Sequence, residues 1–193
     1  KTNIIVIRNG YDPIIFNNEN NHKSDYFVFV GRIAPIKNIE DVLFTFSIII
    51  KHEKFNNFKL KIIGDYNSNL NYTNKLKKLI KEYAISNFVD FVGPKYNKEK
   101  YSLIAGAKCL FCLSHMENDP VVIKEAFSVK TKVLINSNFG LGDFINEKNI
   151  FLKKNTSINL DKFFNFINSD FDDNLIVPIY DWKRVANLYE NIF

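Results

Sequence analysis

"YFVFVGRIAPIKNIEDVLFTFSIIIKHEK", residues 26–54, contains the two patterns from which the fold of this chain can be predicted. Its first six residues are aromatic and β-branched and end on Gly31, which is typical of a strand followed by a turn. From residue 39 to residue 54 the apolar side chains recur at intervals of three and four, which predicts an amphipathic helix. A strand that leads into a helix is the repeating unit of a parallel α/β sheet.

The same alternation continues along the rest of the chain. Further strands are predicted at 59–65, 89–93, 108–114, 132–138 and 150–154, and further helices at 74–85, 98–107, 120–129, 160–169 and 181–193. The strands are continuous apolar runs, as expected when helices cover both faces of a sheet. These patterns predict an α/β, Rossmann-like, doubly wound and mostly parallel sheet of about six strands.

We expect the 193 residues to form a single domain with three parts. Residues 1–25 are predicted to be a connector and loop, 26–180 the Rossmann-like core, and 181–193 a closing C-terminal helix. The chain starts with "KTNIIVIRNG" rather than with Met, from which we expect a domain excised from a longer protein.

Composition and charge narrow the class of protein. A hydrophobic content of 46% and a charged content of 24% are ordinary for a globular domain. The net charge of +5 suits an anionic ligand or surface but does not distinguish nucleotide, lipid and nucleic acid. No segment reaches the ~18 apolar residues of a membrane span, and no signal peptide opens the chain.

The cysteines, Cys109 and Cys112, are three residues apart in a predicted strand. That spacing places them on opposite faces about 10 Å apart, too far for a disulfide. We therefore expect two buried thiols and a cytoplasmic setting.

Ligands of such sheets bind beyond the carboxyl ends of the strands. Gly31 and Arg32 end the first strand, and Lys37 follows five residues later. Gly31 lets the backbone come close to a ligand, and Arg32 and Lys37 are cations that can bind phosphate oxygens. Asp119 is predicted to be an N-cap and Pro120 the first helical residue, which makes a second place for an anion. Together these features predict a diphosphate site.

Several other site classes lack their signatures. No G-x-G-x-x-G follows a strand, and neither a P-loop nor a G-x-S-x-G elbow is present. The three histidines have no metal-ligand spacing, so we expect neither a metal ion nor a cofactor. The basic face formed by Lys75, Lys77, Lys78 and Lys81 is predicted to be a solvated outer face, with a membrane or polyanion patch as the alternative.

Several segments in the same order resemble the C-terminal, donor-binding domain of a family 4 glycosyltransferase (group 1) with the GT-B fold. The central one, "LSHMENDPVVIKEAF" (113–127), resembles the signature P-S-x-x-E-G-F-G-x-x-x-x-E-A-M. The others are "VIRNGYDPIIF" (6–16), similar to an inter-domain connector, "FVGRIAPIKNIEDVL" (29–43), "KLKIIGD" (59–65), "VDFVG" (89–93), "SNFGLGDFI" (137–145) and "YDWKRVANLY" (180–189).

The resemblance implies a role for each matching position. The donor-binding residues would be Gly31, Arg32, Lys37, Pro94, Lys95, Tyr96, Asn118, Asp119, Pro120, Val121 and Glu125, and the catalytic ones Glu117, Arg32 and Lys37. Arg32 and Lys37 would bind the diphosphate, Glu117 would lie near the sugar hydroxyls, and Glu125 would hydrogen-bond the ribose. The backbone of 118–121 would line sugar and phosphate, and 94–96 would face the base.

This chain departs from the family pattern at several of these positions. Asn38 replaces the Gly that usually follows the lysine, and Leu113 replaces Pro. Asn118-Asp119-Pro120 replaces G-F-G, so that a negative charge is expected near the phosphate. The departures bear on sugar specificity more than on the existence of the site.

The function predicted from these residues is donor binding in a retaining glycosyltransferase. The sugar would pass from a nucleoside diphosphate sugar to a glycan, lipid-linked or other acceptor, held by an N-terminal domain outside this chain. We expect a cytoplasmic protein with no nucleic acid partner, and a peripheral position at the inner face of the membrane is the alternative location. The alternatives are a sugar-nucleotide epimerase of the same architecture and a non-catalytic nucleotide- or polyanion-binding module.

Overall fold

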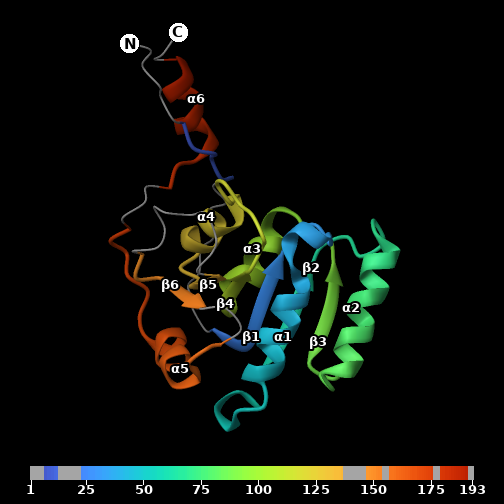
Figure 1. Cartoon of the computed structure of the whole chain (residues 1–193). Coiled ribbons are helices and arrows are strands. Elements are labelled where there is room, and N and C mark those ends of the chain that lie inside the picture. Colours follow the sequence, from blue (N-terminus) through green and yellow to red (C-terminus); the bar gives the residue numbers. More distant parts are fainter. Residues whose placement is uncertain (1–6, 13–22, 137–146, 154–156, 176–178, 191–193) are drawn as a thin grey trace, which may run out of the picture.

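A computed structural model of the chain describes residues 7–12, 23–136, 147–153, 157–175 and 179–190. Within these ranges six strands form one sheet in the order β3-β2-β1-β4-β5-β6, and every neighbouring pair is parallel (Figure 1). The strands are β1 (Ser24–Val30), β2 (Lys59–Ile63), β3 (Val89–Gly93), β4 (Ala107–Cys112), β5 (Val133–Asn136) and β6 (Ile150–Lys153). The predicted doubly wound, Rossmann-like α/β fold is confirmed.

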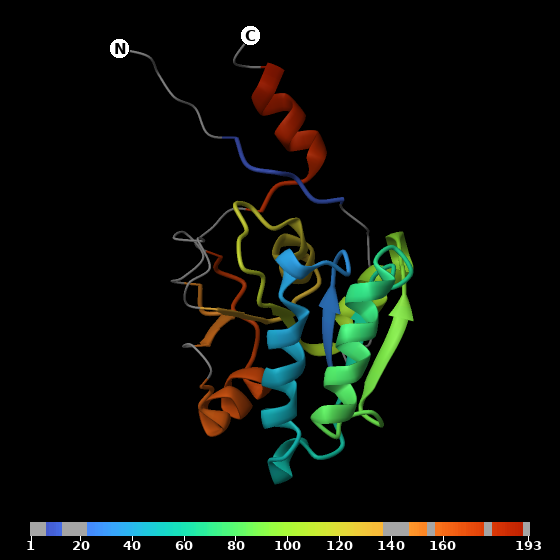
Figure 2. The same ribbon diagram turned by 45° about the vertical axis from the view of Figure 1, so that its right-hand side comes forward.

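Helices cover both faces of the sheet, as the continuous apolar strands predicted. The helices are α1 (Ile39–Ile49), α2 (Leu70–Glu82), α3 (Asn97–Ala105), α4 (Val121–Ser128), α5 (Leu160–Asn168) and α6 (Trp182–Glu190), with short 3-10 turns η1 (Pro35–Lys37) and η2 (Glu53–Phe55). One apolar core packs α1, α2 and α5 against the sheet and a second packs α3 and α4, which lie behind it in Figures 1 and 2.

Two of the helix ends that differ from the sequence prediction have a side-chain cause. The helix predicted to reach residue 54 ends at Ile49, because the ring of His52 accepts a hydrogen bond from the Lys54 amide and starts η2, which turns Phe55 into the core. The helix predicted from residue 74 begins at Leu70, because the side chain of Asn69 accepts from the amide of Tyr72 at 3.1 Å.

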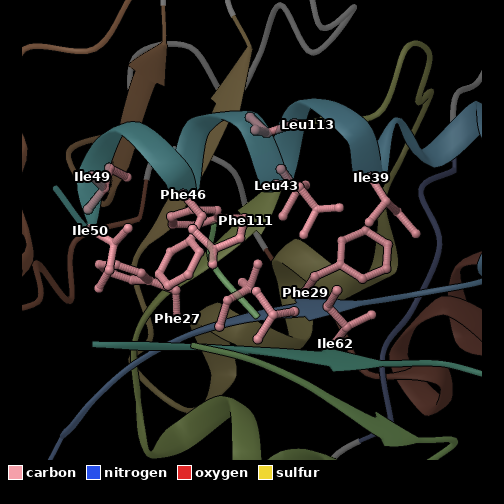
Figure 3. Close-up of a cluster of buried hydrophobic side chains, with 14 of the residues drawn as sticks. Phe27, Phe29, Ile39, Leu43, Phe46, Ile49, Ile50, Ile62, Phe111 and Leu113 are labelled. Atoms are coloured by element: carbon pink, nitrogen blue, oxygen red, sulfur yellow. The ribbon is translucent and has the colours of Figure 1, made fainter. Parts of the chain in front are cut away.

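Aromatic packing fixes α1 on the centre of the sheet. Phe27 of β1 is fully buried, and its ring lies 4.9 Å from the rings of both Phe58 and Phe111, centroid to centroid. Phe46 of α1 meets Phe27 edge-on at 6.3 Å (Figure 3). Offset and edge-to-face contacts stabilise aromatic pairs beyond the burial of their area. This cluster therefore fixes the position of α1 and of the loop that precedes it.

The segment 7–12 pairs with the chain that leads into α6. The amide of Tyr11 donates to the carbonyl of Tyr180 at 3.0 Å, and the amide of Trp182 donates to the carbonyl of Tyr11 at 3.2 Å. A Cβ added to Gly10 would lie 2.8 Å from the Cα of Trp182, so a larger residue does not fit. Beyond this pairing α6 projects away from the sheet (Figure 2).

The two cysteines are buried free thiols, as predicted. Burial, together with the nearby Glu117 carboxylate, raises the pKa of the Cys112 thiol to about 12. Thiols of this kind are poor nucleophiles because the thiolate is the reactive form. None of the helices in the described part of the chain is long and apolar enough to cross a membrane.

Candidate functional site

The order of the strands defines a topological switch point between β1 and β4, and we call the region between the two loops there the crevice. The chain leaves β1 toward β2 on one side and leaves β4 toward β5 on the other, so the two loops diverge at the carboxyl end of the sheet. Ligands of open α/β sheets bind at such a switch point. The loop after β1 carries Arg32 and Lys37, and the loop after β4 carries Glu117.

Two hydrogen bonds fasten these loops to each other. The amide of His115 donates to the carbonyl of Ile36 at 3.0 Å, and the side-chain amide of Asn38 donates to the carbonyl of Leu113 at 3.0 Å. Asn38 has φ of 50° and ψ of 48°, the left-handed region that asparagine tolerates better than most residues. Asn38 thus meets the conformational demand met by glycine in the family pattern and adds a side-chain bond.

An ion pair also joins the two loops across the crevice. The ammonium of Lys37 binds the carboxylate of Glu117, and Ser114 Oγ donates to Glu117 Oε1 at 2.9 Å. The side chains of Lys37 and Glu117 are 23% and 14% exposed, so a ligand from solvent can still reach them. The predicted phosphate lysine and the predicted sugar-side glutamate are therefore in direct contact.

Gly31 and Arg32 begin the loop that follows β1. Arg32 is exposed, and no described residue forms an ion pair with its guanidinium. The backbone of Gly31 packs on Gly64, where an added Cβ would lie 2.1 Å from the Gly31 carbonyl oxygen. A Cβ on Gly31 itself would lie 3.9 Å from Cε of Lys37. The chain at the end of β1 is thus held close to its neighbour and to Lys37.

The predicted role of Asp119 as an N-cap is wrong. Pro120 is the N-cap residue, with no side-chain capping bond, and the helix begins at Val121. The carboxylate of Asp119 instead lies 2.6 Å from Nζ of Lys124 and accepts the amide of Asn9 at 2.5 Å. Lys124 is fully buried, so its ammonium attracts this carboxylate more strongly than the backbone N–H groups at the start of the helix would. The same pairing neutralises the charge that was expected near the phosphate.

Glu125 lies on the inner side of α4, with 6% exposure, instead of on a solvated helix face. Its carboxylate accepts a hydrogen bond from Nζ of Lys100, on α3, at 2.6 Å. The neighbouring Tyr101 hydroxyl donates to the carbonyl of Asp12 at 2.7 Å, and burial followed by the Glu125 charge raises the pKa of Tyr101. Glu125 is therefore already paired before any ribose hydroxyl is considered.

Pro94, Lys95 and Tyr96 follow β3, two strands away from β1 in the sheet. Gly93 turns the chain there with φ of +82°, and Tyr96 is 71% exposed, a free aromatic face beside the loop. Lys95 pairs with Glu99 at 3.4 Å. A shallow hollow lies between the end of β3 and α3; its lining residues are Val92, Lys95, Lys98, Glu99, Ser102 and Leu103. Of the predicted donor-binding residues only Lys95 lines it.

Sequence reasoning missed a buried polar network on the β5 side of the crevice. Nζ of Lys153, 1% exposed, lies 2.6 Å from Asp41 Oδ1. The side-chain amide of Asn136 donates to Asp41 Oδ2 at 3.1 Å and to the carbonyl of Leu113 at 3.2 Å. No local pattern indicates this network, because it requires β6, β5 and α1 to come together.

Two further predictions concern the surroundings of the site. The segment 137–145, predicted to resemble a family motif, lies outside the described residues. Within the ranges that the structure describes, no group of three or more His, Cys, Asp and Glu side chains could hold a metal ion.

Comparison with known families and structures gives one family match. The family model for "glycosyl transferases group 1" matches residues 11–172, while no curated protein sequence matches the chain. Among solved structures, AviGT4, a glycosyltransferase involved in avilamycin A biosynthesis, has a TM-score of 0.74 at 17% identity and covers 97% of this chain. S. aureus TarM, in a complex that includes UDP and alpha-GlcNAc-glycerol, has a TM-score of 0.75 at 22% identity and covers 100%.

A third similar structure is that of Anabaena Alr3699/HepE in complex with UDP and glucose, with a TM-score of 0.67, 17% identity and 97% of this chain covered. This chain spans 56% of AviGT4, 40% of TarM and 56% of HepE. It thus spans about half the length of these proteins. At these identities the likeness establishes the fold.

Proposed function

Because this chain belongs to the glycosyl transferases group 1 family, we propose that it is the donor-binding domain of a retaining glycosyltransferase. The observation that carries the proposal is the Lys37–Glu117 pair, which joins the loops after β1 and β4 at the switch point of the sheet. UDP is present in the structures of TarM and HepE, which supports a nucleoside diphosphate as the common part of the donor.

The proposed mechanism uses the positive groups of the crevice. The bond from the sugar to the diphosphate breaks, and negative charge develops on the departing diphosphate. Arg32, which is exposed, and Lys37, which Glu117 holds in place, would meet that charge, and cations placed in this way stabilise a transition state. An acceptor hydroxyl oxygen would bond to the anomeric carbon from the face on which the diphosphate leaves, which retains the configuration of the sugar, and the hydroxyl proton would pass to the departing phosphate oxygen. No metal ion or cofactor is needed for this stabilisation.

Glu117 and Glu125 would recognise the two ends of the donor. The carboxylate of Glu117 lies beside Lys37, where the sugar attached to the diphosphate would lie, and it can accept from sugar hydroxyls. Glu125, on the neighbouring helix, would accept from the ribose hydroxyls while Lys100 keeps its charge balanced. The exposed Tyr96 would lie near the base. The acceptor, a glycan or lipid-linked molecule, would bind to a further domain.

Calorimetric titration with UDP, GDP, ADP and CMP tests the proposal. One charge-assisted hydrogen bond contributes roughly 1.5–3 kcal/mol, and 1.4 kcal/mol is about tenfold in affinity. Arg32→Ala and Lys37→Ala should therefore weaken the tightest nucleotide about ten- to a hundredfold. Lys54→Ala is the matched control, since its ammonium pairs with the 74% exposed Asp161 on α5 instead of lying in the crevice.

The alternative functions give different outcomes. Unchanged affinity in both Arg32→Ala and Lys37→Ala, with the fold intact, would refute the proposed diphosphate site. Turnover of a nucleotide sugar without an acceptor would favour an epimerase. Binding of nucleic acid with a steep salt dependence, and of no nucleotide sugar, would favour a polyanion-binding module.

A further inference from the structure

Lys124 is a buried cation inside the donor domain that neither the proposed reaction nor the apolar core uses. It lies on α4 between Ile123 and Glu125, and its side chain is 1% exposed. An ammonium is costly to bury unless it is paired and hydrogen-bonded. Its partners therefore indicate what the charge holds in place.

One partner of Lys124 belongs to segment 7–12 and the other to the loop that follows β4. Nζ donates to the carbonyl of Asn9 at 2.6 Å and to Asp119 Oδ2 at 2.8 Å. Asp119 also accepts the amide of Asn9 at 2.5 Å, and the side-chain amide of Asn9 donates to the carbonyl of Asp119 at 3.1 Å. Each of the three residues thus binds the other two, and we call Asn9, Asp119 and Lys124 the latch.

The latch connects two segments that are far apart in the sequence. One is the loop 117–120, which contains Glu117 and the backbone proposed to line the sugar and phosphate. The other is the segment 7–12, which the chain entering α6 holds through the backbone bonds of Tyr11. A movement of 7–12 relative to the sheet must therefore break the latch or displace the loop.

We propose that Asp119 and Lys124 are positioning residues that make nucleotide affinity depend on the docking of segment 7–12. This inference rests on the proposed function. Neither side chain is proposed to touch the nucleotide, since the Asp119 carboxylate already pairs with Lys124 and Arg8 and accepts the amide of Asn9. The pair acts through the backbone of 118–120, which it holds against the connector.

Coupling of this kind is reciprocal. If docked 7–12 strengthens nucleotide binding by some factor, bound nucleotide must stabilise docking by the same factor. Typical couplings between two sites are about 5- to 150-fold. A role confined to fold stability would give neither effect.

The test combines titration and amide hydrogen exchange in wild type, Asp119→Asn, Lys124→Met and the double variant. The probe is whichever of UDP, GDP and ADP binds the wild type most tightly. The double variant removes the buried ion pair of the latch and leaves no unpaired buried charge, so it separates loss of that pair from misfolding. Lys132→Met is the matched control, because Lys132 is also a buried lysine but binds the carbonyls of Phe166 and Ser169, near the end of α5.

We expect the double variant to bind the probe at least about fivefold more weakly, the lower end of typical coupling. Bound probe should slow exchange of amides 8–12 in the wild type and in Lys132→Met but not in the double variant. Equal affinity in the wild type and the double variant, or equal protection of 8–12 by the probe, would overturn the inference while leaving the proposed function intact. Failure of the wild type to bind any of the three nucleotides would overturn both.

Discussion

Replacing Glu117 by glutamine should strengthen the binding of a free nucleoside diphosphate. In the structure the Lys37 ammonium is engaged by the Glu117 carboxylate, and an incoming diphosphate competes for the same cation. Glutamine keeps the size of the side chain and an acceptor for Ser114 but removes the competing charge. Lys37 is then free to bind phosphate oxygens.

The magnitude follows from the exposure of the pair. Fully exposed ion pairs contribute about 0.2–1 kcal/mol, and charge-assisted hydrogen bonds in less exposed settings about 1.5–3 kcal/mol. The Lys37 and Glu117 side chains, at 23% and 14% exposure, lie between these cases. If removing the Glu117 charge frees about 1 kcal/mol of interaction energy at Lys37, the diphosphate should bind roughly fivefold more tightly.

Isothermal titration of wild type, Glu117→Gln and Lys37→Ala with the same nucleoside diphosphate measures the effect. Affinity should rise in Glu117→Gln and fall in Lys37→Ala, so the two variants move in opposite directions. With the complete nucleotide sugar the gain should shrink, because Glu117 is proposed to accept from the sugar hydroxyls. A loss of diphosphate affinity in Glu117→Gln as large as that in Lys37→Ala would refute the competition.

Two further predictions concern the fold around the site. Gly64→Ala should lower the free energy of unfolding by about 3 kcal/mol, because its Cβ would lie 2.1 Å from the Gly31 carbonyl oxygen. Gly31→Ala is the control, since the nearest contact of its Cβ would be Phe29 Cζ at 3.4 Å, and its free energy of unfolding should stay within about 1 kcal/mol of wild type. Urea unfolding measures both variants, and equal losses of stability would contradict this reasoning. Burial lowers the pKa of Lys23 to about 8, so between pH 8 and about 10.4 the unfolded chain holds more protons and stability rises with pH. The stability of wild type relative to Lys23→Met should thus increase across that range by up to about 3 kcal/mol, and a difference that does not change with pH would count against it.

The strands could be predicted from the sequence because their signal is local. A continuous apolar run such as 26–31 is readable without its partners, and the short connections leave few alternatives to a parallel sheet. Helix ends depend on single side-chain contacts. Neither the His52 contact that starts η2 nor the Asn69 cap that starts α2 four residues early shows in the apolar periodicity.

For the candidate site, the sequence predicted where the residues lie in the fold better than it predicted which residues they bind. The ends of β1 and β4 are defined by the topology, so Lys37 and Glu117 could be expected on facing loops. The partners of Asp119 could not be predicted from the sequence, because Lys124 lies five residues further on and Asn9 lies 110 residues away. The local sequence predicted that the Asp119 side chain would cap the helix. In the structure this carboxylate binds the buried ammonium of Lys124 instead.

The carbonyl of Leu113, next to the end of β4, is the point at which the crevice is held from two sides. It accepts from Asn38 in the loop after β1 and from Asn136 at the end of β5. Asn136 is itself oriented by Asp41, whose other oxygen is bound by buried Lys153. These bonds connect the loop that carries Glu117 to the loop after β1 on one side and to the end of β5 on the other. Because ordering a loop on binding costs conformational entropy, a loop already fastened in this way leaves more of the interaction with a donor available as affinity. Asn38 and Asn136 therefore support the site by limiting the movement of Glu117 relative to Lys37, although neither is proposed to touch the donor.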